Sequence, residues 1–456
     1  MAKKRIYLNA IEKSCPTDTP GLWAHPDDEG HRYKDLSYWT ELAQLLESGG
    51  FDAVFFPDVL GQYDVYKKSR DTCLEQAIQA PINDPTYVIP AMAAVTKHLG
   101  FAVTCSTTYE HPYALARKMS TLDHLTKGRI GWNVVTSFLK SAARNYGLED
   151  QLTAEERYEI GEEYLDVCYK LWEASWEVDA VVQDREARIY TDPSKVHDIG
   201  HEGARFKVPG IHLCEPSPQR TPVIYQAGAS TRGRAFAAAH AEGVFLNTPT
   251  SEATKAIIDD IRSKAQAAGR RPEDLLFFPK LTVIVGRTEE EAQRKYQDYL
   301  KYSSTEGLLA LLGGWSGIDF ADYGPERLLQ FAKNSNNRSI IEYLNDHPDK
   351  QWTVDELANI YAFGTTSLTI GSPEQIADAM ERYIEQTGAD GFNISYITRP
   401  GSNRDFVELV VPELRRRGLV QEHYSDGVLR DKLFGQGPNL PDQHPGRTRS
   451  VLGVKA

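Results

Sequence analysis

The fold is decided by the stretch FAVTCSTTYEHPYALARKMSTLDHLTKGRIGWNVV, residues 101–135, which holds two strand-like runs with a helix-like run between them. Residues 101–106 and 129–135 are rich in apolar and β-branched side chains, which favour buried strands. Between them, Pro112 opens a helical segment and Gly128 closes it, as expected of a first-turn proline and a terminal glycine. A strand, a helix and a second strand in this order predict a parallel pair joined by a crossover helix.

The same alternation continues on both sides of this unit. A helical pattern with apolar residues from 36 to 46 on one face ends at Gly49. Asp84 and Pro85 predict the start of a helix that ends at Gly100, and a capping box at Thr153 predicts a long helix through about residue 174. Eight strands are predicted in all, at residues 5–10, 51–58, 101–106, 129–135, 222–228, 243–248, 275–285 and 391–397.

Eight strands with intervening helices predict an α/β fold of the TIM (β/α)8 barrel type. No G-x-G-x-x-G motif follows the first strand, which argues against an open, doubly wound sheet. We predict one barrel domain over residues 1–424, with insertions near 180–220 and 303–352. The second insertion is the candidate lid. Residues 425–456 are predicted to be a C-terminal extension that frays or wraps a neighbouring chain.

Composition excludes several classes of partner. The 456 residues carry a net charge of −13, and such an acidic surface repels nucleic-acid phosphates and anionic membrane lipid. The five cysteines include no C-x-x-C pair, and no signal peptide or membrane span is visible, so we expect a reducing, cytoplasmic location. His111 and His124 have no third ligand at metal spacing, so no metal site is expected.

In a TIM barrel, binding and catalytic groups come from the C-terminal ends of the strands. We expect the polar residues at those ends to converge on one mouth. They are Asp58, Ser106, Thr107, Thr108, Asn133, Thr136, Ser137, residues 226–230 and Asn247. Asp58 would suit a hydrogen bond to a bound heterocycle, although a loop turn is the simpler explanation. No G-x-S-x-G elbow and no P-loop is present, so acyl transfer and nucleotide hydrolysis lack their usual motifs.

The run QAGASTRGR, residues 226–234, joins the fifth strand to a helix. Its small residues let the backbone approach a ligand, and free N–H groups at a helix start attract an anion, so a phosphate is the natural guest. A plain tight turn with Ser230 as the helix N-cap explains the same residues equally well. Arg232 and Arg234 slightly favour the phosphate. Tyr158, on the capped helix, could reach a phosphate or lie in the core.

A family resemblance is carried by residues 107–137, TTYEHPYALARKMSTLDHLTKGRIGWNVVTS. Their His-Pro, Ala-Arg, Leu-Asp and Gly-Arg series resembles that of the bacterial-luciferase-like superfamily. Further matches are WAHP (23–26), FDAVFFPDVLGQYDVY (51–66), CEPSPQRTPVIYQAG (214–228) and DGFNISY (390–396). Together they resemble the branch that contains long-chain alkane, dimethyl-sulfide, nitrilotriacetate and dibenzothiophene-sulfone monooxygenases.

This resemblance implies a two-component FMNH2-dependent monooxygenase. A separate NAD(P)H:flavin reductase supplies FMNH2, which reacts with O2 to form a C4a-peroxyflavin. The C4a-peroxyflavin then oxidises a small or medium apolar substrate, alkane-like or organosulfur. The site must then be closed and largely apolar. The resemblance also implies a homodimer or homotetramer. By matching motif, it implies FMN contacts at Asp58, Asn133, Thr136, Ser137, Tyr158, Ala227, Gly228, Ala229 and Ser230.

The match to the long-chain alkane enzyme of that branch associates Cys15, Tyr63 and Gln79 with catalysis in the substrate pocket. Phe138 and Leu311 stand where that enzyme has histidines. Losing titratable groups changes what the pocket can hydrogen-bond and how protons move, so alkane oxidation does not transfer with the resemblance. Two other hypotheses stay open: a deazaflavin-dependent oxidoreductase on the same barrel, and a non-catalytic flavin-binding protein.

Overall fold

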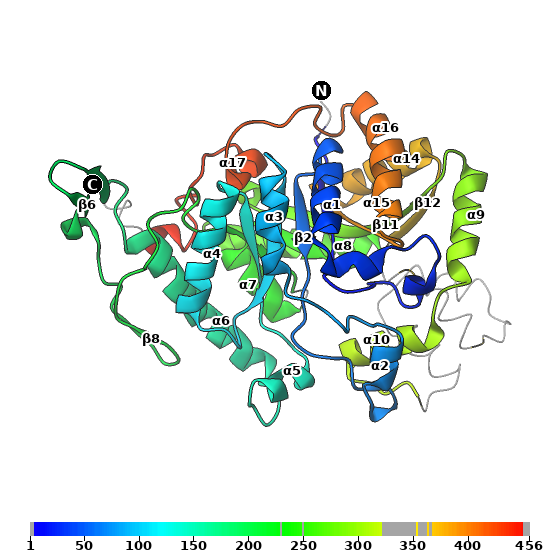
Figure 1. The fold of residues 1–456 in the computed structure, drawn as a ribbon, viewed down its shortest axis with the longest axis horizontal. Helices are drawn as coiled ribbons and strands as arrows, with labels where there is room; N and C mark the ends of the chain where they lie inside the picture. Colours follow the sequence, from blue (N-terminus) through cyan, green and yellow to red (C-terminus); the bar gives the residue numbers. More distant parts are fainter. Residues whose placement is uncertain are drawn as a thin grey trace.

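A computed structural model describes residues 4–228, 230–248, 250–321, 353, 363 and 367–449 (Figure 1). Within these residues, eight parallel strands close into a TIM barrel, as the sequence predicts. The strands are β1 (Tyr7–Ile11), β2 (Ala53–Phe56), β3 (Gly100–Ser106), β4 (Ile130–Val135), β9 (Val223–Gln226), β10 (Gly243–Leu246), β11 (Leu276–Val285) and β13 (Gly391–Ser395). The ring closes because β13 pairs with both β1 and β11. A further strand, β12 (Ser367–Gly371), pairs with the C-terminal half of β11. The sequence analysis did not predict this strand.

Helices cover the outer face of the barrel (Figure 1). They are α1 (Leu36–Ser48), α3 (Ile89–Ala94), α4 (Pro112–Thr126), α6 (Ala154–Tyr169), α7 (Thr231–His240), α8 (Ser251–Ala267), α9 (Glu289–Leu300), α14 (Pro373–Thr387), α15 (Gly401–Asp405) and α16 (Val411–Arg416). The predicted capping box at the start of α6 is present, since the Thr153 hydroxyl accepts the Glu156 N–H while the Glu156 carboxylate accepts the Thr153 N–H. Three more helices lie at one end of the barrel: α2 (Asp71–Glu75), α5 (Lys140–Asn145) and α10 (Thr305–Ser316).

The helix predicted over residues 84–100 is wrong in length. A short turn, Pro85–Tyr87, precedes α3, which ends at Ala94. The carboxylate of Glu47, on α1, accepts hydrogen bonds from the backbone N–H groups of residues 97–99 at 2.8 to 3.1 Å. These donors therefore bond to a side chain instead of continuing the helix.

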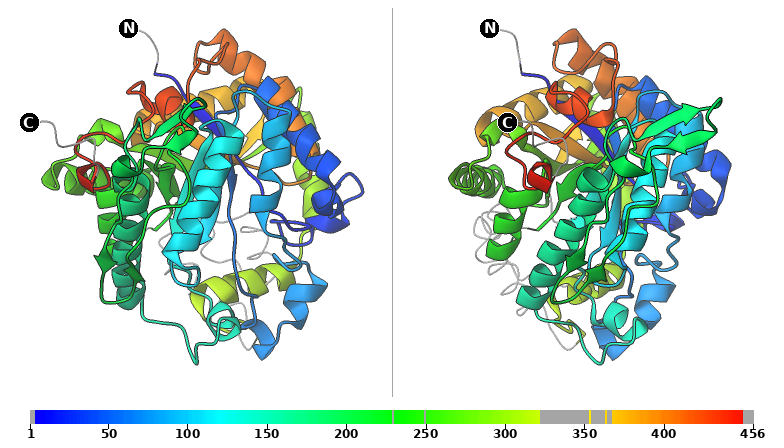
Figure 2. Two further views of the ribbon diagram at one scale, coloured as in Figure 1. Left: turned by 60° about the vertical axis from the view of Figure 1, so that its left-hand side comes forward. Right: turned by 90° about the vertical axis from the view of Figure 1, so that its left-hand side faces the viewer.

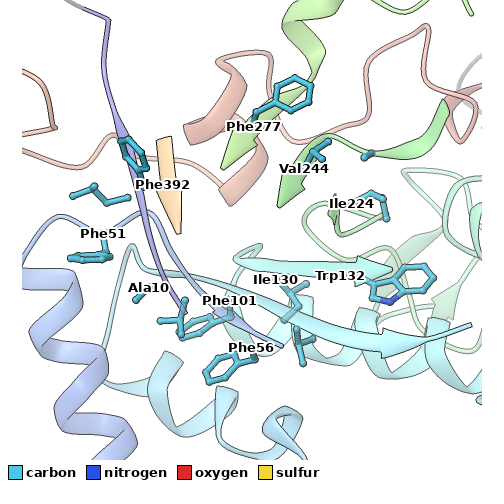
Figure 3. Packing of buried hydrophobic residues seen from close by; sticks show 14 of the residues in the cluster. Ala10, Phe51, Phe56, Phe101, Ile130, Trp132, Ile224, Val244, Phe277 and Phe392 are labelled. Carbon is cyan, nitrogen blue, oxygen red and sulfur yellow. The ribbon is translucent and has the colours of Figure 1, made fainter. Parts of the chain in front are cut away.

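Two layers of apolar side chains form the core. Between strands and helices lie residues such as Trp132, Phe277 and Phe392 (Figure 3). Inside the barrel, Tyr225 and Phe245 stack with ring centroids 4.7 Å apart. Alternate residues along each strand face the two layers, which explains why the strand sequences read as nearly continuous apolar runs.

The insertion predicted near 180–220 forms two short antiparallel hairpins. One joins β5 (Val181–Asp184) to β6 (Ile189–Thr191), and the other joins β7 (His201–Glu202) to β8 (Lys207–Val208). Of the second predicted insertion, α10 is described, and the candidate lid residues 322–352 lie outside the described residues.

The C-terminal extension packs against its own barrel as far as residue 449, so this part of it does not fray as predicted. Its helix α17 (Leu429–Phe434) covers the N-terminal ends of the strands, where the Leu433 carbonyl accepts the Tyr7 hydroxyl at 2.9 Å. The buried Arg430 donates to the buried Glu242 at 2.6 Å. Helices α17 and α10 therefore stand at opposite ends of the barrel (Figure 2). No helix in the described ranges is long and apolar enough to cross a membrane.

Candidate active site

Two adjoining cavities open at the C-terminal ends of the strands. The inner cavity, of about 270 Å³, reaches into the barrel mouth, and the outer cavity, of about 650 Å³, lies beside α6 and α7. Four residues line both cavities: Asp58, Val135, Ala227 and Trp315. The two spaces therefore form one continuous site at the end of the barrel where TIM-barrel enzymes bind their ligands.

Most of the predicted cofactor residues meet at this site. Asp58, Asn133 and Ala227 line the inner cavity. The outer cavity is lined by Asp58, Thr136, Ser137, Tyr158, Ala227, Gly228 and Ser230. Ala229 lies outside the described residues. These residues converge from three strand ends, those of β2, β4 and β9, and from α6.

The loop between β9 and α7 is shaped to let a side chain or ligand come close to the backbone. A Cβ atom on Gly228 would stand 2.7 Å from the Tyr158 hydroxyl, and one on Gly233 would stand equally close to it. The Ser230 hydroxyl accepts the Gly233 N–H at 3.0 Å and caps α7. Ser230 is therefore a helix N-cap, as the tight-turn interpretation predicts, and the phosphate interpretation stays a prediction at this helix N-terminus.

Arg157 adds a cation that the sequence analysis did not single out. It lines the outer cavity beside Tyr158, and its Nε is buried with no hydrogen-bond partner among the described residues. Arg232 and Arg234, which the sequence suggested instead, form ion pairs with Glu162 and Asp260. Helical spacing offered a signal, because residues 154, 157 and 158 share one face of α6.

The end of β4 is held in an unusual backbone conformation. Ser137 has φ of +53°, a left-handed value that residues other than glycine rarely adopt. Its hydroxyl donates to the Ser106 hydroxyl at 2.9 Å, and the Thr108 hydroxyl donates to the Thr136 carbonyl at 2.6 Å. Backbone strain of this kind is often found at ligand sites.

Several buried amide oxygens at the barrel mouth lack a donor among the described residues. Asn133 donates through Nδ2 to the Thr104 hydroxyl at 2.8 Å, but its Oδ1 accepts nothing there. The same holds for Gln226 Oε1 and Asn393 Oδ1. An unsatisfied buried acceptor costs about 1–3 kcal/mol, so this group suits a ligand that brings N–H donors.

Asp58 has an unusual acidity. Burial and then the neighbouring carboxylate of Asp84 raise the pKa of Asp58 to about 7. Near neutral pH, a large share of the molecules therefore carries a protonated Asp58, which can both donate and accept a hydrogen bond.

The predicted catalytic residues lie behind the cavity wall. Cys15 is fully buried, and its thiol donates to the Thr17 carbonyl at 3.2 Å. Burial raises the pKa of this thiol to about 11, which disfavours the thiolate at neutral pH. The Tyr63 hydroxyl donates to Gln79 Oε1 at 3.1 Å, and Gln79 Nε2 donates to Asp18 at 3.2 Å. Asp18 lines the inner cavity, so Tyr63 and Gln79 reach the site through it.

Phe138 and Leu311 both line the site. Phe138 borders the outer cavity with 46% of its surface exposed, and Leu311, on α10, borders the inner cavity. At the two positions where the long-chain alkane enzyme was expected to have histidines, this chain thus places apolar side chains at the cavity wall.

Comparison with known proteins identifies the family of this chain. Residues 19–391 match the family described as luciferase-like monooxygenase. The dimethyl-sulfide monooxygenase of Hyphomicrobium sulfonivorans is 51% identical over 447 residues, which is 97% of this chain and 93% of that protein. A solved structure of DmoA from Hyphomicrobium sulfonivorans is 48% identical, has a TM-score of 0.92 and covers 99% of this chain and 97% of that chain.

The long-chain alkane monooxygenase of Geobacillus thermodenitrificans is 53% identical over 445 residues, which is 97% of each chain. A solved long-chain alkane monooxygenase has a TM-score of 0.90, with 98% of this chain and 100% of that chain covered. A riboflavin lyase, solved with modified FMN and riboflavin, is 35% identical with a TM-score of 0.89 and the same coverage. The chain therefore belongs to the luciferase-like monooxygenase family.

Proposed function

We propose that this protein is the oxygenase component of a two-component FMNH2-dependent monooxygenase. It takes reduced FMN from a separate NAD(P)H:flavin reductase and transfers one oxygen atom from O2 to a small or medium apolar substrate, alkane-like or organosulfur. The observation that carries the proposal is the outer cavity, where a helix N-terminus, a hydroxyl and a cation surround one space that is continuous with the barrel mouth.

The residues present fit FMN. At the phosphate end, Ser230, the Tyr158 hydroxyl and Arg157 supply donors and positive charge. At the ring end, the unpaired oxygen of Asn133 suits an N–H group of an isoalloxazine.

When bound, reduced FMN supplies the electrons that activate O2. The protein's part is to orient the ring, to hold or release a proton at Asp58 and to exclude water. Leu308, Leu311 and Trp315 from α10 make the inner wall apolar, as a water-sensitive reaction requires.

Anaerobic titration with photoreduced FMN tests the first step, and the proposal predicts saturable binding. Oxidised product should then form only when reductase, NAD(P)H and O2 are all present. Failure of reduced FMN to bind would contradict the proposal. Tighter retention of reduced deazaflavin than of FMNH2 would favour the deazaflavin-dependent alternative. Steady hydrogen peroxide release without product from any substrate would favour a non-catalytic flavin-binding protein.

A homodimer or homotetramer in the cytoplasm remains part of this proposal. Light scattering on the eluting protein measures the first, and fractionation of cells measures the second. A monomeric mass at working concentration would contradict the assembly.

A further inference from the structure

Two ammonium groups face the inner cavity. Lys13 follows β1, and Lys280 lies in β11 beside Asn393 of β13. Neither lysine lines the outer cavity, although β11 is two strands and β1 four strands away from β9 around the barrel. The loop after β9, which we propose binds phosphate, would therefore use a different cation, Arg157.

The two lysines share one carboxylate. Lys13 Nζ pairs with Asp18 Oδ1, which also accepts from Gln79 Nε2 at 3.2 Å, and Lys280 Nζ stands 3.6 Å from Asp18 Oδ2. The ammonium groups of Lys13 and Lys280 lower the pKa of Asp18 well below its usual range, even though burial raises it. Asp18 thus stays ionised and supplies one negative charge for two positive ones.

Other charged groups near the cavity do not remove this excess. Asp58 lines the cavity too, but its raised pKa leaves much of it uncharged near neutral pH. The guanidinium of Arg399 donates to the Lys13 carbonyl at 3.0 Å and to the Tyr396 hydroxyl, and it lies 3.9 Å from Glu12. The excess charge therefore remains on the lysine pair.

Lys280 is the lysine whose ammonium group has unused hydrogen-bond donors. Its distance to Asp18 is longer than a hydrogen bond, and in the part of the chain that the structure describes it makes no closer polar contact. Protein surrounds the residue, yet 20% of its side-chain surface is open, because that surface faces the cavity. Burial lowers the pKa of Lys280 although Asp18 raises it, as expected of a cation that lacks a full set of partners.

The remaining wall of the inner cavity is largely apolar, with Pro20, Leu308, Leu311, Trp315 and Phe363 among its residues. A volume of about 270 Å³ limits this inner cavity to a small ligand. A ligand for this space must be small, mostly apolar and able to satisfy a buried ammonium.

We propose that Lys280, together with Lys13, binds the anionic group of the substrate, and that the substrate is a small apolar molecule with one carboxylate or sulfonate. That this small anion is a substrate, and not only a ligand, rests on the proposed monooxygenase function. The apolar part lies against α10, and the charged end satisfies the donors that Asp18 leaves free.

Hexanoate and hexanamide are matched probes, because they have the same size and differ in charge. Calorimetric titration of the full chain, with and without oxidised FMN, should show hexanoate binding about ten-fold or more tighter than hexanamide. Lys280→Met should abolish that preference. The exposed Lys207→Met should keep it. Equal affinities for the two probes, or a preference that survives Lys280→Met, would overturn the proposal.

A second variant keeps the test decisive if Lys280→Met unfolds. Asp18→Asn removes the competing carboxylate, so hexanoate should bind several-fold more tightly to this variant. Unchanged or weaker binding would count against the proposal.

Reduced FMN is titrated separately on the same variants. If Lys280→Met weakens reduced FMN and leaves hexanoate binding unchanged, the ammonium serves the flavin and the proposal is overturned. If FMN does not bind at all while the hexanoate preference persists, the monooxygenase proposal fails and the anion subsite stands.

Discussion

Replacing Asp58 by Asn tests the unusual acidity of this cavity carboxyl group. Burial, and then the charge of Asp84, raise its pKa from 3.8 to about 7. The folded chain therefore holds this proton more tightly than the unfolded chain does. The resulting stability is fully present below the unfolded pKa of about 3.9, and it is lost as the pH rises through about 7.

The magnitude follows from the two pKa values. From about pH 5 to about pH 7, roughly 1.4 kcal/mol per pH unit gives about 3 kcal/mol of lost stability. Because Asp58 faces a cavity that water can enter, we expect about half of this, roughly 1–2 kcal/mol. Between about pH 5 and about pH 8, the wild-type chain should lose that much more unfolding free energy than Asp58→Asn, whose amide gains no charge.

Urea unfolding of flavin-free protein at the two pH values measures the effect. Asp71→Asn, at an exposed carboxylate on α2, is the matched control and should follow the wild type. If the wild type and Asp58→Asn lose the same free energy between the two pH values, the reasoning about this carboxyl group is refuted.

Three further substitutions test the site and the fold. Gly228→Ala should weaken FMN binding about ten-fold by calorimetry, because the new methyl group would stand 2.3 Å from Gln226 Nε2 and 2.7 Å from the Tyr158 hydroxyl. Gly210→Ala, with open space around it, should have no effect; equal effects would contradict the account. Tyr158→Phe should raise the Kd for FMN about ten-fold and leave that for riboflavin unchanged, because only the phosphate loses a donor; a loss for both flavins would point to a packing role. Arg430→Met should lower the unfolding free energy in urea by about 3–5 kcal/mol, because Glu242 stays buried without its partner, and adding Glu242→Gln should restore part of it; a loss below about 1 kcal/mol would show that the pair is not buried in solution.

The barrel could be predicted because its signals are local. Each strand is a short apolar run, and caps such as Thr153 and Ser372 mark helix starts, so the eight barrel strands and the capped helices lie where the sequence predicts them. The end of α3 could not be predicted in the same way. It depends on Glu47, a carboxylate about fifty residues earlier in the chain that takes the backbone donors of residues 97–99.

The site could be predicted only in part, for the same reason. Asp58 and the loop after β9 follow strands, and Asn133 lies in the C-terminal half of β4. The C-terminal ends of all barrel strands meet at one mouth. The lysine pair offers no comparable signal, because Lys280 lies inside a strand and meets Asp18 only after the ring closes. The C-terminal tail has a polar sequence, and only the folded barrel shows that Arg430 fits a buried carboxylate.

The central claim is that the cavity beside α7 binds the phosphate of FMN. Anaerobic titration with reduced FMN and with reduced riboflavin tests it most directly, because the two flavins differ only in that phosphate. Charge-assisted hydrogen bonds from Ser230, Tyr158 and Arg157 predict that reduced FMN binds about 100-fold more tightly than reduced riboflavin. Equal affinity for the two flavins would contradict the account.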